Sequence, residues 1–201
     1  MSRGHEILSE LNTCEIPMQK TLLILFYGLM TSVITVAHEI PSNITLRAFI
    51  KPEGDRMELL VRVPLEAMQD MQIPTRKGGY LDLTRIEPVL QQAAILWISG
   101  SIDIYENETL IDAPTLLAAR VSLPSNRTFD YYATAREHLK SPPLPKSTEI
   151  YWNQALLDVL FEYSIRSDQS EFSINSRFDR LGIRVMNSMR FLRPDGSLQK
   201  I

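Results

Sequence analysis

Cysteine is nearly absent from this sequence of 201 residues, with Cys14 as its single example. One thiol cannot form a disulfide within the chain, and it cannot supply a thiolate metal site. Cys14 also lies upstream of a predicted processing site at residue 37, so the exported chain is expected to hold no cysteine nucleophile. Stability must then come from an ordinary apolar core, and the remaining length is enough to bury one.

An excess of basic residues is also lacking. The formal net charge is −3, and the part of the chain after residue 37 carries −2 because the preceding segment holds two basic and three acidic side chains. No cluster of Lys or Arg along the sequence is of the kind that binds nucleic acid or anionic lipid. We therefore expect no nucleic-acid partner and no peripheral binding to membranes.

Histidine is scarce, and motifs for catalysis are missing. His38 and His138 are the only imidazoles after residue 37. The sequence contains no GxSxG elbow, GxGxxG or Walker loop, HExxH or CxxC. His138 lies beside Glu137 in a predicted helix, where adjacent residues do not share a face, so a solvated histidine near the helix end is expected. A lone imidazole lacks the partners that acid–base catalysis requires, and we expect that the protein is not an enzyme.

An uncharged, largely apolar run over residues 21–37 is the most distinctive feature near the start of the chain. Lys20 precedes it, and Thr35 and Ala37 are small residues at the spacing that signal peptidase recognises. The pattern predicts a signal peptide over residues 18–37. A membrane-spanning anchor is the alternative, since the run is close to the minimum length that crosses a bilayer.

The segments on either side of the predicted signal peptide follow from this assignment. Residues 1–17 are polar and represent either a leader overhang or a misassigned start, because Met18 would itself begin a well-formed signal peptide. Residues 38–201 are predicted to form one extracytoplasmic domain, on the periplasmic side of the cell membrane, with His38 as its first residue.

Alternating apolar residues mark the beginning of this domain. Residues 44–50 and 57–63 both show a period of two, and residues 51–55 (KPEGD) between them have turn chemistry. The pattern predicts a β-hairpin and hence a half-buried antiparallel sheet.

Further elements predict an α+β, β-rich fold, an antiparallel sheet or sandwich-like domain with one or two short helices. The clearest helix covers residues 83–99, with Thr84 as N-cap and Glu87 at the capping-box position, and a second short helix covers residues 128–140. Strands are predicted at residues 102–106, 116–123, 172–174, 183–192 and 197–201. Because the last of these stops soon after a hairpin turn, the chain is expected to be truncated at its C-terminus.

Residues 150–165 fit two patterns. Polar residues recur every four positions, which suits a helix, and apolar residues recur every two from residue 155, which suits a strand. We predict a short helix to about residue 155 and then a central strand. In that strand Leu157, Val159 and Phe161 face the core, and Asp158→Asn is expected to cost little stability. Asp158 and Glu162 share a face in either structure, so a carboxylate-based hydrolase is a third, weaker functional alternative.

Several sequence blocks resemble a known family. They cover residues 37–54 (AHEIPSNITLRAFIKPEG), 58–68 (ELLVRVPLEAM), 78–83 (GGYLDL), 119–129 (ARVSLPSNRTF) and 151–165 (YWNQALLDVLFEYSI). In these blocks the chain resembles the extracytoplasmic N-terminal region of HupE/UreJ-family membrane proteins. The resemblance implies a following bundle of hydrophobic helices and a link to nickel-dependent hydrogenase and urease accessory functions. None of the family's metal-related residues falls on a position of this chain.

The first functional hypothesis is therefore a non-catalytic extracytoplasmic domain of a membrane protein, associated with the handling of a transition metal such as nickel. Its partners would be a downstream membrane domain and the metal. The main alternative is a free secreted β-rich binding module.

His38 is the candidate metal ligand. After cleavage its α-amino group and imidazole Nδ1 would form a chelating pair, which suits nickel, copper or zinc. Glu39 or His138 could add a third ligand.

Overall fold

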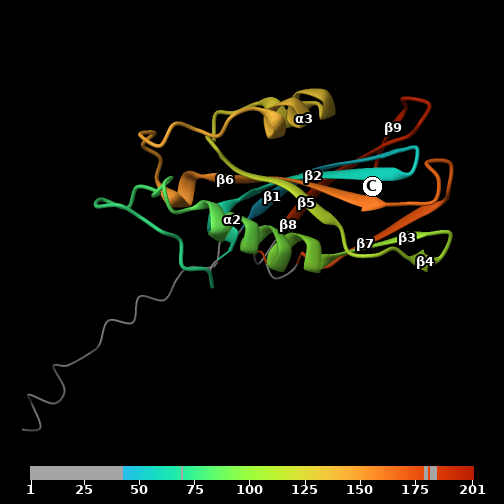
Figure 1. Ribbon diagram of the computed structural model, residues 1–201, viewed down its shortest axis with the longest axis horizontal. Helices are drawn as coiled ribbons and strands as arrows, with labels where there is room; N and C mark the ends of the chain where they lie inside the picture. The colour runs from blue at the N-terminus through green and yellow to red at the C-terminus, as the bar shows by residue number, and fades with distance from the viewer. Residues whose placement is uncertain (1–42, 69, 179–180, 182–184) are drawn as a thin grey trace, which may run out of the picture. The chain divides into compact units, whose positions relative to one another are not determined.

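The computed structural model describes residues 43–201 except 69, 179–180 and 182–184 (Figure 1). These residues all belong to one compact unit that spans Glu39–Ile201. The predicted leader overhang at residues 1–17, the predicted signal peptide at residues 18–37 and His38 lie outside the described residues.

A six-stranded sheet forms the centre of this unit, in the order β5-β6-β2-β1-β8-β9. Its strands are β1 (Ile44–Glu53), β2 (Arg56–Pro64), β5 (Thr115–Ser122), β6 (Leu156–Ser164), β8 (Val185–Leu192) and β9 (Leu198–Lys200). The predicted hairpin is confirmed as β1 and β2, which pair antiparallel across Gly54, a residue with φ +64 that favours glycine. All neighbouring pairs are antiparallel except β1 and β8, which run parallel.

A second, three-stranded sheet has the order β4-β3-β7. It consists of β3 (Ile102–Glu106), β4 (Thr109–Leu110) and β7 (Phe172–Ser176), all antiparallel. Together the two sheets confirm the predicted β-rich α+β fold.

The first helix begins later than predicted. Helix α2 covers Glu87–Ala93 and continues as a π-helix, η2 (Ala94–Ile98). Thr84 is not its N-cap, because the Thr84 backbone N–H and hydroxyl both donate to the carboxylate of Asp82, at 3.0 and 2.6 Å, and this closes a separate turn. Pro88 falls in the first turn of the helix, where it is tolerated.

The second helix, α3 (Tyr132–Lys140), follows a 3₁₀ turn, η4 (Thr128–Asp130). The other short 3₁₀ turns are η1 (Leu65–Ala67), η3 (Ser99–Ser101) and η5 (Trp152–Gln154). Within the described ranges, no helix combines the length and apolar character needed to span a bilayer.

Helices α2 and α3 cover opposite faces of the large sheet (Figure 1). The larger apolar cluster includes Leu157, Val159 and Phe161 together with Leu90 of α2, so the predicted core-facing side of β6 is confirmed. A smaller cluster on the other face joins Leu160 to α3. Strand β6 is therefore buried on both faces, and this positions the polar residues described next.

Candidate functional site

A buried carboxylate lies at the centre of the α3 side of the sheet. Asp158 in β6 is fully buried and faces Arg62, its cross-strand partner in β2. The Arg62 guanidinium binds it through two hydrogen bonds, from Nε to Oδ1 and from Nη2 to Oδ2, each 2.6 Å. Burial alone would raise the pKa of Asp158, but hydrogen bonds from Arg62, His138 and Ser122 outweigh burial, so the pKa lies below its usual value.

His138 completes this buried polar network, and the prediction of a solvated helix-end histidine is wrong. Its Nε2 atom lies 2.7 Å from Oγ of Ser122 in β5 and 3.1 Å from Oδ2 of Asp158. Its side chain is only 17% exposed, because α3 packs with this face toward the sheet. The adjacent Glu137 takes no part in the network, as expected for a neighbour on a different face.

Serine, histidine and aspartate meet here, but their geometry differs from that of a catalytic triad. In a triad the imidazole bonds serine through one nitrogen and aspartate through the other. In this network Nε2 faces both, and the Ser122 hydroxyl donates its only proton to Asp158. The hydrogen bonds from Nε2 of His138 to Oγ of Ser122 and Oδ2 of Asp158 therefore need a proton on Nε2. A protonated Nε2 cannot accept a proton from Ser122. Ser122 is also 1% exposed, and Arg62 compensates the charge of Asp158.

The network attaches α3 and η4 to the sheet. Arg62 also donates to the carbonyl of Asn126 at 2.6 Å, and its guanidinium lies 4.4 Å from the ring centroid of Phe129. Arg120 in β5 donates from Nε to the carbonyl of Leu139 at 2.7 Å, in the last turn of the helix, where a cation is favourable. These contacts give the buried charges a structural role.

Asp158 and Glu162 do not form a joint site. Asp158 is bound by Arg62, whereas Glu162 is half-buried and lies 3.6 Å from Arg56. Each carboxylate of the predicted pair thus has its own arginine partner. The hydrolase alternative loses the observation on which it depended.

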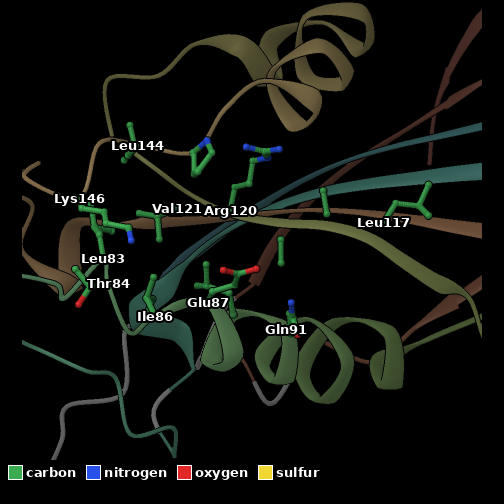
Figure 2. Close-up of a pocket in the computed structure, with 14 residues that line it drawn as sticks. Leu83, Thr84, Ile86, Glu87, Gln91, Leu117, Arg120, Val121, Leu144 and Lys146 are labelled. Atoms are coloured by element: carbon green, nitrogen blue, oxygen red, sulfur yellow. The ribbon is translucent and has the colours of Figure 1, made fainter.

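A groove between α2 and β5 is the best candidate for a binding site (Figure 2). This hollow of about 380 Å³ is bordered on one side by residues 117–121 of β5. Successive side chains of a strand point to opposite faces, so five consecutive residues can border one hollow only along the edge of the strand. In the described part of the chain β5 is the last strand of its sheet, and its outer backbone groups therefore face the groove.

The other walls of the groove supply apolar and charged side chains. Glu87 and Gln91 reach from α2 toward β5, and Leu144 and Lys146 close one end (Figure 2). A β-bulge between Leu116 and Ala118 leaves Leu117 half-exposed at the groove. Bulges of this kind often re-aim a side chain beside a functional surface.

No protein-family model matches the sequence, and no curated protein matches it. The resemblance to HupE/UreJ-family proteins therefore stays a prediction.

The metal prediction stays untested by the fold, because His38 lies outside the described residues. In the described ranges no group of three or more His, Cys, Asp or Glu side chains is placed to hold a metal ion.

The sequence contained one signal for the buried network that our prediction did not use. A charged residue inside the apolar run LLDVLF is rarely buried without a partner. The signal for the groove is weaker, since its walls come from three separate segments of the chain.

Proposed function

We propose that the chain is a non-catalytic extracytoplasmic domain of a membrane protein, and that its α2–β5 groove binds an extended polypeptide segment. The groove carries this proposal, because an open strand edge beside a helix is the arrangement in which a peptide can add as a further strand. Backbone hydrogen bonds would supply affinity, and the side chains of the walls would select the sequence.

The side chains that line the groove indicate what kind of peptide sequence it would bind. Ala119, Val121 and Leu144 offer small apolar contacts, and the exposed Lys146 lies at the end of the groove opposite Leu117. A segment with alternating apolar side chains and an acidic residue at the Lys146 end fits these walls. The buried polar network supports a non-catalytic role, since Ser122 and Asp158 are almost fully buried, Arg62 compensates the charge of Asp158, and the network attaches α3.

Two neighbouring glutamines allow a matched test of the groove. Gln91 and Gln92 are adjacent and exposed on α2, but only Gln91 lines the hollow. Linear peptides selected from a random display library on the unmodified chain should bind the Gln92→Trp variant equally well and lose at least tenfold in affinity for Gln91→Trp. Failure to select any peptide, or equal binding to both variants, would contradict the proposal.

The membrane and metal parts of the proposal rest on the sequence. A reporter enzyme that works only outside the cytoplasm should be active when it is fused after Ile201. Cell fractionation would then distinguish a membrane protein from the alternative of a free secreted module.

For the metal, calorimetric titration of the exported protein with Ni²⁺ and Cu²⁺ should show binding that His38→Ala weakens. One extra residue before His38 should weaken it similarly; equal affinity in all three proteins would remove His38 from any metal role.

A further inference from the structure

Cationic side chains from distant parts of the chain gather on the outer part of the α3-facing sheet surface. Phe49 of β1 belongs to the apolar cluster beneath α3, and its register partner in β8 is Arg190, whose own partner in β9 is Lys200. Partners across neighbouring strands share a face, so Arg190 and Lys200 lie on this side, as does Arg47, two residues before Phe49. Arg127, in the loop before η4, reaches the same place through Asp130. We call these four cations the basic strip.

The basic strip carries more positive charge than its contacts compensate. Arg47 Nη1 and Arg127 Nε bind the Asp130 carboxylate at 3.1 and 2.9 Å, and Arg190 Nη1 donates to the Asp130 backbone carbonyl at 2.8 Å. In the described part of the chain Asp130 is the only carboxylate bonded to any of the four. Nearby arginines hold the pKa of Asp130 below its usual value, so it remains ionised. Four cations against one anion leave the strip strongly positive on a chain whose net charge is −3.

Exposed apolar side chains lie on the same face as the strip. Met186 is the register partner of Thr45 in β1, and Leu198 is the partner of Leu192, which packs toward the α3 cluster. The two side chains are 54% and 56% exposed. Cations combined with exposed apolar side chains are typical of surfaces that lie on an anionic bilayer, where the charges meet headgroups and the apolar groups enter the interface.

We propose that the basic strip binds anionic phospholipid at a membrane surface, with Met186 and Leu198 entering the interface. The two exposed apolar side chains favour lipid over nucleic acid, since a polyanion in water would leave those side chains without a partner. This surface is separate from the α2–β5 groove, and its test does not depend on peptide binding. The proposal departs from our expectation of no peripheral membrane binding, because residues 47, 127, 190 and 200 are scattered in the sequence and form no cluster along it.

The electrostatic part is tested on the full chain with vesicles of phosphatidylcholine alone or mixed with phosphatidylglycerol. The measured quantity is the ratio of affinities for the mixed and neutral vesicles, because the apolar run at residues 21–37 contributes to both. The Arg127→Glu/Lys200→Glu variant should lower this ratio by more than tenfold, since each cation near the surface is worth about fivefold. Lys77→Glu/Arg85→Glu, which changes net charge equally at two exposed positions elsewhere, should lower it by less than about threefold.

The apolar part uses a second pair of variants. Met186→Ser/Leu198→Ser should weaken binding to mixed vesicles several-fold, whereas Leu110→Ser, at a leucine of similar exposure in β4, should leave it unchanged. Circular dichroism and thermal unfolding show whether each variant is folded. If Arg127→Glu/Lys200→Glu is not, Arg127→Gln/Lys200→Gln replaces it, and if Met186→Ser/Leu198→Ser is not, Met186→Ala/Leu198→Ala replaces it. Three results would overturn the proposal: no preference for anionic vesicles, equal loss in the control variants, or tighter binding to duplex DNA than to mixed vesicles.

Discussion

Asp158 holds its charge inside an apolar strand because Arg62 binds both of its oxygens. We had expected Asp158→Asn to cost little, but the burial of Asp158 against Arg62 predicts a large cost instead. The substitution leaves Arg62 buried without a counter-charge, and loss of one member of a buried pair costs about 3–5 kcal/mol. The free energy of unfolding in urea should fall by this amount, whereas Glu162→Gln, on the same strand but paired only at the surface, should cost about 0–1 kcal/mol. A cost of Asp158→Asn no larger than that of Glu162→Gln would mean that the buried Arg62–Asp158 pair contributes no more than a surface pair.

Glu106 at the end of β3 should make stability depend on acidity. Burial alone would raise its pKa, but the Ser170 hydroxyl and the backbone N–H groups of Arg166 and Ser167 bind its carboxylate, and the pKa lies below the ordinary 4.5. A depressed folded-state pKa stabilises the fold above about pH 4.5, and this contribution is lost as the pH falls through the folded-state pKa.

Glu106→Gln should therefore lower stability at neutral pH and make it less sensitive to pH below about 4.5. Urea unfolding across this range measures the effect, with Glu149→Gln, an exposed glutamate, as control. A Glu106→Gln variant with the full acid dependence of the unmodified protein would show that Glu106 is not responsible.

Among the elements, β6 has buried apolar side chains in the clusters on both faces of the sheet. Phe161 is 1% exposed within the larger apolar cluster, so Phe161→Ala should cost about 3–5 kcal/mol in the free energy of unfolding. Tyr131→Ala removes an aromatic ring that is 73% exposed and should change stability by less than about 0.5 kcal/mol. Comparable losses in the two variants would contradict the assignment of the core face.

Local sequence patterns predicted the helices and strands better than they predicted which of these elements pair or pack together. The period of two found the hairpin and β6, since alternation records which face is buried. It could not show that α3 would cover the second face of β6, because that depends on contacts between residues far apart in the chain, such as Ser122 with His138. The parallel pairing of β1 with β8 was missed for the same reason. The start of α2 was misplaced because Thr84 bonds Asp82 in a local turn.

At the scale of the whole molecule, the order of the large sheet predicts how its backbone amides exchange with solvent. Strands β2 and β1 lie in the middle and have partners on both sides, so their amides should exchange only with global unfolding. At the edge, β5 pairs only with β6 among the described strands. Its N–H groups should therefore alternate between slow exchange toward β6 and fast exchange toward the groove. Hydrogen exchange followed by NMR on the free chain, and again with a peptide bound, measures both patterns. The fast amides of β5 should become protected when the peptide binds and remain fast in the Gln91→Trp variant. Uniform slow exchange along β5 in the free chain would mean that its edge is already paired, and would leave no room for an added strand.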